Sequence, residues 1–135
     1  MIPKKEVVYL PLNCTMRQAI ERMEFHRYTA LPIIDGNGKY AGTLTEGDLL
    51  WKMKNTPGLT FANTEKIPIT EIPRRIKNEP VRIDATIESL LNLAVTQNFV
   101  PVVDDHDTFI GIIRRREIIL YFAQQAAQMK TIPAK

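Results

Sequence analysis

The hydrophobic and polar positions in the first half of the chain predict five short elements. Thr15-Met-Arg-Gln18 has the pattern of a capping box, and the apolar positions behind it recur at helical spacing. The turn sequence Asp35-Gly-Asn-Gly38 lies between two apolar runs, which is typical of a hairpin. The expected elements are, in order, a strand over 6–10, a helix over 16–26, strands over 30–34 and 39–45, and a helix over 46–54.

The second half of the chain repeats this order. Its expected elements are a strand over 81–83, a helix over 86–97, strands over 99–103 and 109–114, and a helix over 115–129. Each half is therefore a β-α-β-β-α unit. We expect its first β-α-β segment to be a right-handed parallel crossover.

The two hairpin regions are also similar residue by residue. Residues 31–50 read LPIIDGNGKYAGTLTEGDLL, and residues 100–119 read VPVVDDHDTFIGIIRRREII. The ungapped alignment, with equivalent positions 69 residues apart, pairs Pro32 with Pro101, Asp35 with Asp104, Gly42 with Gly111, and Asp48 with Glu117. Units of this size are marginal alone, so we expect them to share one core. The predicted division is repeat 1 over 1–54, a connector over 55–72 and repeat 2 over 73–135, within an α/β fold.

Composition and motifs argue against several classes of protein. The chain is 44% hydrophobic and 24% charged, as in globular domains, and its net charge of +3 is too modest to indicate nucleic-acid binding. One cysteine and two separated histidines predict neither an intramolecular disulfide nor a metal site. Because the sequence has no nucleophile elbow or P-loop, we expect no enzymatic activity. No apolar stretch approaches about 18 residues and no signal-peptide pattern opens the chain, so we expect a cytoplasmic protein without a membrane partner.

The order of elements, with h-P-h-h-D before each hairpin and G-h-h-T-x-x-D after the first, resembles the CBS domain family. Two tandem copies resemble its paired unit, often called a Bateman module. The resemblance implies pseudo-twofold packing of the two repeats, two related clefts between them, and commonly a homodimer. It also implies a regulatory module that binds an adenosine-containing ligand. Because the chain leaves no room for an attached enzyme or channel, it resembles the stand-alone members. We therefore expect it to signal to a separate target protein.

The ligand residues implied by the resemblance lie mainly in the first repeat. In Gly42-Thr-Leu-Thr-Glu-Gly-Asp48, Thr45 and Asp48 would contact the ribose of the ligand. An apolar slot for the adenine would combine Thr43 with Pro80 and Val81. The competing interpretation is that Asp48 only caps its helix, because acidic and hydroxyl residues are common at helix N-termini.

The second repeat departs from the motif, because Arg114 and Glu117 replace the threonine and the aspartate. Arg114, Arg115 and Arg116 lie at a predicted helix start, where the resemblance implies contacts to the phosphates of a nucleotide bound by the first repeat. A solvated arginine run is the alternative. We therefore expect one strong cleft and one weak one. The expected regulatory ligand is AMP, ADP, ATP or cyclic di-AMP, with no cofactor required. The alternative function is a structural or dimerisation module without a nucleotide.

Overall fold

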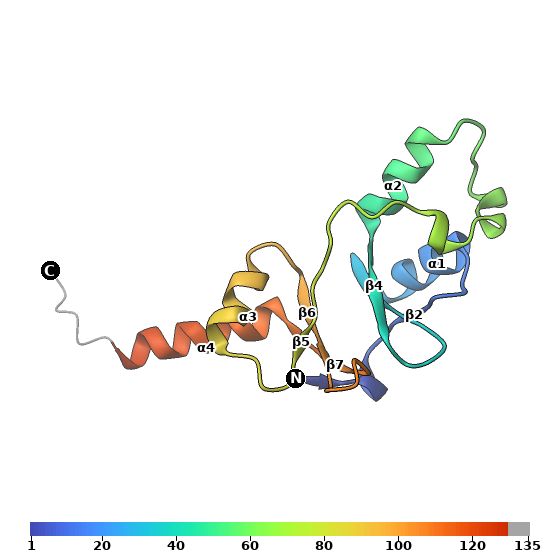
Figure 1. Ribbon diagram of the computed structural model, residues 1–135. Helices are drawn as coiled ribbons and strands as arrows, with labels where there is room; N and C mark the ends of the chain where they lie inside the picture. Colours follow the sequence, from blue (N-terminus) through green and yellow to red (C-terminus); the bar gives the residue numbers. More distant parts are fainter. Residues whose placement is uncertain (130–135) are drawn as a thin grey trace, which may run out of the picture.

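The two halves of the chain form two small sheets, each packed against a pair of helices (Figure 1). This computed structural model describes residues 1–129. The first unit contains β2 (Leu10–Pro11), α1 (Met16–His26), β3 (Ala30–Ile34), β4 (Tyr40–Thr45) and α2 (Glu46–Asn55). The second contains β5 (Val81–Arg82), α3 (Ile87–Ala94), β6 (Phe99–Val103), β7 (Phe109–Arg114) and α4 (Arg115–Gln128). The predicted α/β architecture with two β-α-β-β-α repeats is confirmed.

Strand pairing is the same in the two units. β2 is parallel to β3, which is antiparallel to β4, and β5 is likewise parallel to β6, which is antiparallel to β7. Each parallel pair is joined through a helix, as a β-α-β crossover requires. The apolar faces of the helices cover the sheets, with Met16 and Met23 of α1 in the first core and Leu90 of α3 with Ile118 of α4 in the second. The expectation of one shared core is therefore wrong, because each repeat buries its own apolar helix faces against its own sheet.

Side-chain caps set three of the four helix starts. Thr15 and Thr45 each complete a capping box, at α1 and α2, and the Thr86 hydroxyl accepts the Ser89 N–H at α3. Helix α4 begins at Arg114, whose guanidinium has no acceptor atom. There the Glu117 carboxylate accepts the Arg114 N–H at 2.9 Å instead.

Equivalent positions of the two repeats meet each other across the interface between them. Lys39 and Thr108, which are 69 residues apart, form an isolated antiparallel bridge. Thr29 and Asn98 are also equivalent, and the Asn98 amide donates to the Thr29 hydroxyl at 3.5 Å. Contacts between a position and its own equivalent are the signature of a twofold axis. The expected pseudo-twofold packing is therefore present.

The strand predicted over 6–10 is wrong in most of its length. Residues Lys4–Glu6 form a short 3₁₀ helix, η1, and only Leu10–Pro11 pair as β2. Val7 and Val8 line a cavity between the repeats. The apolar pattern that predicted a strand therefore reflects contact with this cavity and not strand pairing. An additional strand, β1 (Ile2–Pro3), pairs antiparallel with β7 of the second sheet (Figure 1).

The segment between the repeats packs onto the first repeat. It contains two 3₁₀ helices, η2 (Ala62–Lys66) and η3 (Ile69–Glu71). The Met16 N–H donates to the Ile67 carbonyl at 2.7 Å, and the side chains of Ile69 and Ile72 are buried in the first core. Within residues 1–129, no helix is both long enough and apolar enough to cross a membrane.

Candidate functional site

A cavity of about 710 Å³, which we call the first cleft, lies between β4 and the segment leading into β5. Gly42 and Thr43 line it from the first repeat, and Pro80 lines it from the second. The structure thus brings together two of the predicted base-binding residues, Thr43 and Pro80. Val81, the third, lies half-buried in β5, where it pairs with Val102 and packs against the second core.

Two hydroxyl groups stand on the wall of this cleft. Tyr40 Oη and Thr43 Oγ1 are 2.7 Å apart, and Tyr40 also donates to the Asn78 carbonyl at 3.5 Å. Burial raises the pKa of Tyr40 to about 12, against a smaller opposite effect from the Thr43 hydrogen bond. Tyr40 is therefore a neutral hydroxyl at physiological pH, suited to hydrogen bonding with a polar ligand group.

Asp48 lies in the first turn of α2 and is almost fully enclosed. Its carboxylate accepts the Thr45 N–H through Oδ2 at 3.0 Å, while the Thr45 hydroxyl accepts the Asp48 N–H at 3.2 Å. The second oxygen, Oδ1, accepts the N–H of Arg75 at 3.0 Å. Only 3% of Asp48 is exposed, and it does not line the first cleft. The capping role considered for Asp48 is thus observed, together with a second, tertiary role.

Residues 73–79, which we call the strap, run along the first cleft toward β5. Arg74 donates to the Ala41 carbonyl at 3.0 Å, and its guanidinium lies against Gly42, at the place where a Cβ would be. Gly42 has a φ of 121°, a conformation that suits glycine and leaves its Cα open to this approach. The Arg75 guanidinium carbon lies 5.2 Å from the centre of the Trp51 ring.

The far end of the strap is fixed to the second repeat. The buried amide of Gln97 accepts the Glu79 N–H at 2.8 Å and donates to the Glu79 carbonyl at 3.1 Å. From the sequence, Arg74 and Arg75 could either reach a phosphate or belong to a solvated connector, and nothing in the sequence marks Gln97. No periodic pattern in the sequence predicts the contacts of the strap arginines or the bonds of Gln97, because the partners are distant in sequence and meet only in the folded chain.

The second cleft is smaller, with a volume of about 210 Å³. It is lined by Val7 and Val8 from the first repeat and by Asn98 and Arg114 from the second. Although partial burial opposes the effect, the hydrogen bond from the Arg114 N–H and nearby positive charge lower the pKa of Glu117. Glu117 is therefore ionised, and its carboxylate is hydrogen-bonded to the Arg114 N–H at the start of α4.

The three consecutive arginines point to three different surroundings, as the 100° rotation per helical residue requires. Arg114 faces the second cleft. Arg115 donates through Nε to the Gln97 carbonyl at 3.0 Å, which places it behind the anchored end of the strap. Arg116 is exposed, and among residues 1–129 it makes no ion pair.

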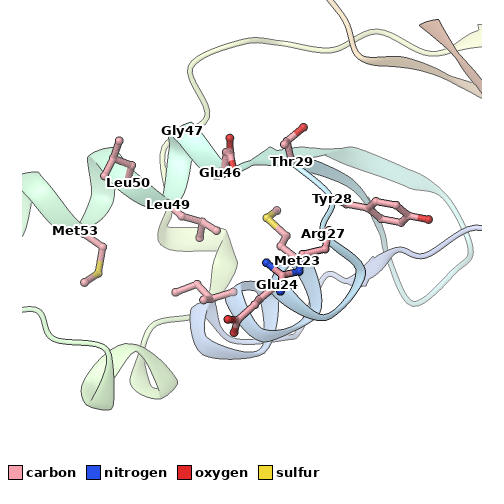
Figure 2. Close-up of a pocket in the computed structure, with 11 residues that line it drawn as sticks. Met23, Glu24, Arg27, Tyr28, Thr29, Glu46, Gly47, Leu49, Leu50 and Met53 are labelled. Atoms are coloured by element: carbon pink, nitrogen blue, oxygen red, sulfur yellow. The ribbon is translucent and has the colours of Figure 1, made fainter. Parts of the chain in front are cut away.

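A third cavity, of about 720 Å³, is a groove between α1 and α2 on the first repeat (Figure 2). Met23 of α1 and Leu49, Leu50 and Met53 of α2 supply its apolar lining. Glu24, Arg27 and Glu46 add charges to the same lining. The groove is separate from the first cleft and shares Tyr28 and Thr29 with the second, and its apolar helix faces are typical of a protein contact.

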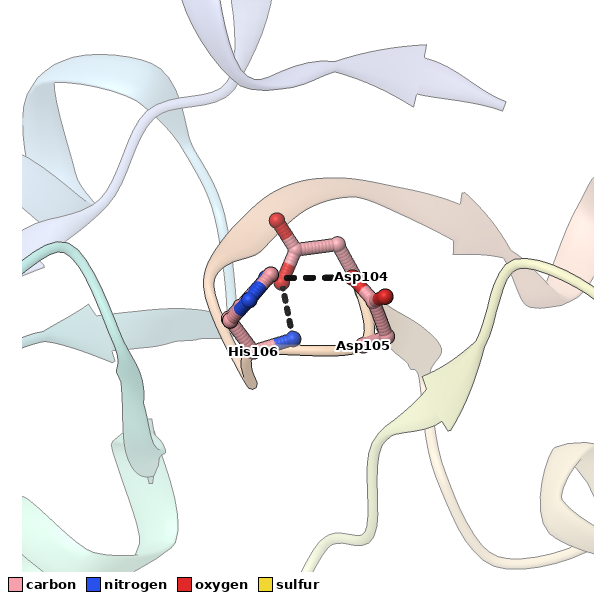
Figure 3. A group of neighbouring side chains, drawn as sticks. All are labelled: Asp104, Asp105 and His106. Carbon is pink, nitrogen blue, oxygen red and sulfur yellow. Dashed lines mark hydrogen bonds and ion pairs between the residues drawn. The ribbon is translucent and has the colours of Figure 1, made fainter.

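The second hairpin gathers Asp104, Asp105 and His106, whose potential ligand atoms lie within 4.8 Å of one another (Figure 3). Asp104 accepts the backbone N–H groups of Thr108 at 2.9 Å and of His106 at 2.8 Å. These bonds, that of Thr108 first, lower the pKa of Asp104. Asp35 accepts the Asn37 and Lys39 N–H groups in the equivalent turn. The shared pattern accounts for the cluster as turn chemistry.

Comparison with known proteins assigns both repeats to one family. The model of the CBS domain matches residues 1–55 and again residues 69–124. Two curated relatives, both from Methanocaldococcus jannaschii, are each 26% identical over 85% of this chain: inosine-5'-monophosphate dehydrogenase and the uncharacterized protein MJ1225. The chain spans 21% of the first and 45% of the second.

Solved structures share the whole fold. CbpB of Listeria monocytogenes, in complex with c-di-AMP, is 20% identical, with a TM-score of 0.80 and 96% of each chain covered. CBSX2 in complex with AMP is 23% identical, with a TM-score of 0.74 and 93% of each chain covered. At this identity the likeness establishes the fold.

Proposed function

Because the chain belongs to the CBS domain family, we propose that it is a regulatory module that binds an adenine nucleotide in the first cleft. The observation that carries this proposal is the position of the G-h-h-T-x-x-D motif. Its Thr43 lines a cavity of about 710 Å³ together with Pro80, and its Asp48, which does not line the cavity, accepts the Arg75 N–H of the strap. The cleft combines an apolar wall with a few polar groups, as small-molecule sites do.

The proposed contacts to the base and to the ribose come from different residues. Thr43, Pro80 and Val81 would form the slot for the base. Thr45 and Asp48 would take the ribose, because an ionised carboxylate can accept hydrogen bonds from both hydroxyl groups of the sugar. Similar folds bind c-di-AMP in CbpB and AMP in CBSX2, which supports an adenine nucleotide for this cleft.

Among the predicted phosphate contacts Arg114, Arg115 and Arg116 at the N-terminus of α4, Arg116 is the proposed main contact, because Arg114 faces the second cleft and Arg115 donates to the Gln97 carbonyl. A helix N-terminus favours anions, and guanidinium groups add charge-assisted hydrogen bonds. Arg116 is exposed and has no ion pair among the described residues. Its side chain can therefore reorient toward a phosphate without breaking an ion pair. This arrangement favours AMP, ADP, ATP or cyclic di-AMP over an uncharged nucleoside.

A thermal-shift panel with these four nucleotides and adenosine tests the proposal. A ligand present at 100 times its dissociation constant stabilises the protein by about 2.7 kcal/mol. Calorimetry then counts the sites: we expect one mononucleotide per chain, or half a cyclic dinucleotide if two chains share it. Unchanged melting with every compound would refute nucleotide binding, and two equal sites per chain would refute the proposed difference between the clefts.

We also propose that the module is a homodimer that signals to a separate target protein. The apolar groove between α1 and α2, and the exposed side chains Phe25 and Leu50 of these helices, favour a protein contact there. Leu50→Asp should halve the mass measured by light scattering, whereas Lys54→Asp, near the end of the same helix, should leave the mass unchanged. A monomeric parent protein would refute the homodimer.

A further inference from the structure

The strap holds the contacts that a nucleotide would need in the first cleft. Asp48 Oδ1 accepts the Arg75 N–H, and the enclosure of this carboxylate leaves 3% of the residue exposed. A ribose hydroxyl therefore reaches Asp48 only if the Arg75 backbone moves. The planar Arg74 guanidinium lies against Gly42, within the cleft that Thr43 also lines and that is proposed above for the base.

The two ends of the strap are anchored, and its middle is held by single contacts, which include the 3.5 Å bond from Tyr40 to the Asn78 carbonyl and the Arg75–Trp51 contact. Ile72, immediately before the strap, is buried in the first core, and Glu79 is bound by two hydrogen bonds to the buried Gln97. Between these anchors Arg74 and Arg75 are exposed and make single hydrogen bonds to the first repeat. Movement of the strap thus requires the loss of few contacts and leaves both cores intact.

We propose that the strap is a displaceable cover of the first cleft, and that Arg74 makes this cleft selective for ligands that carry phosphate. The inference rests on the proposed function and names the regulation of the same site. Opening the strap removes the Arg74 guanidinium from the Ala41 carbonyl. A phosphate restores a charge-assisted partner for this guanidinium, whereas adenosine offers none. The free energy needed to open the strap therefore weakens the binding of a nucleoside. For a nucleotide, the new bond between Arg74 and the phosphate offsets that free energy.

Arg74→Ala tests the selection directly, because it removes both the cover over Gly42 and the charge. Calorimetry should show adenosine binding at least about threefold tighter than to the parent protein, because the exposed hydrogen bond from the Arg74 guanidinium to the Ala41 carbonyl no longer has to be broken. The ratio of AMP affinity to adenosine affinity should fall at least about tenfold, because only AMP loses a charged partner. Adenosine affinity that is unchanged or weaker would overturn the inference.

Arg82→Ala is the matched control. Arg82 is also an exposed arginine that donates to a backbone carbonyl, that of Asp104 at 3.2 Å, but it lies outside the first cleft. It should leave both affinities unchanged. An equal change in both variants would show a general effect of surface charge and would overturn the role of Arg74.

Movement of the strap has an independent reporter, because Trp51 is the single tryptophan and lies beside Arg75. AMP binding to the parent protein should increase quenching of Trp51 fluorescence by acrylamide as the guanidinium leaves the ring. Unchanged quenching at saturating AMP would overturn displacement of the strap. If neither the parent protein nor Arg74→Ala binds any adenine compound, the proposed function fails and this inference with it. If AMP binds but Arg74→Ala does not bind adenosine more tightly than the parent protein does, the role of the strap is refuted and the proposed function stands.

Discussion

Asp48→Asn separates the two roles of Asp48, because it keeps the size of the side chain and removes one of its two acceptor oxygens. In the parent protein, Oδ2 accepts the Thr45 N–H and Oδ1 accepts the Arg75 N–H, each at 3.0 Å. The asparagine oxygen can serve one of these donors. Its amide group then faces the other donor, which stays enclosed without an acceptor.

The magnitude follows from the burial of this site. An enclosed donor left without a partner costs about 1–3 kcal/mol. For a domain of this size, that loss lowers the melting temperature by roughly 4–10 °C. The capping bond to Thr45 is local, so we expect the oxygen to stay with Thr45 and the Arg75 N–H to be released. The strap should then show faster amide hydrogen exchange at Arg75 than in the parent protein.

Glu117→Gln is the matched control at the equivalent position of the second repeat. Glu117 is 31% exposed, and its Oε1 accepts the Arg114 N–H, so glutamine can keep that bond and loses only the ion pairs with Arg114 at 3.5 Å and with the N-terminal ammonium group at 3.7 Å. We expect a loss below about 1 kcal/mol, as for exposed ion pairs. Melting is followed by circular dichroism at neutral pH. If Asp48→Asn melts within about 1 °C of the parent protein, or no lower than Glu117→Gln, the reasoning about its two acceptor oxygens is wrong.

The same variant measures the proposed ribose contact. Loss of the anionic acceptor should weaken AMP binding by roughly 1.5–3 kcal/mol, or about ten- to a hundred-fold. A 2′-deoxynucleotide, which offers one hydroxyl fewer to Asp48, should be affected less. A lower melting temperature with unchanged AMP affinity would show that Asp48 only positions the helix and the strap.

Three further substitutions test the packing and the pH dependence. In Gly111→Ala, the new Cβ meets the backbone carbonyl of Ile2 in β1, so we expect a loss of about 1–3 kcal/mol, measured by chemical denaturation. The pKa of Tyr40, raised to about 12 from 10.0, contributes stability that is present below pH 10.0 and lost as the pH rises toward 12. Tyr40→Phe should therefore show a smaller fall in melting temperature across that interval. The pKa of Asp104 is lowered below 3.8, chiefly by the Thr108 N–H, so its contribution is present above pH 3.8 and lost at lower pH. Asp104→Ala should show a smaller acid-induced fall below that pH, and a fall equal to that of the parent protein would contradict the assignment.

Local chemistry along the chain was sufficient to predict most of the fold. Thr15 caps the helix whose start it predicted, and the turn at Asp35 forms the expected hairpin. These features involve residues at most a few positions apart, so spacing and turn chemistry carry the information. The constant separation of 69 residues predicted the two repeats, and the resemblance to the CBS domain family implied the pseudo-twofold, which the bridge between Lys39 and Thr108 confirms.

Only the tertiary structure decided which polar groups share a cleft and which are already bound. Asp48 and Arg75 are 27 positions apart, and Glu79 and Gln97 are 18 positions apart. No periodic pattern marks either pair, because each depends on how the strap lies over two cores formed by other residues. The pairing of β1 with β7 is equally invisible in the sequence, since two residues are too few for a strand pattern. The sequence by itself determined the two repeats and the motif. The path of the strap determined that Asp48 is covered and that Arg74 lies against Gly42 in the first cleft.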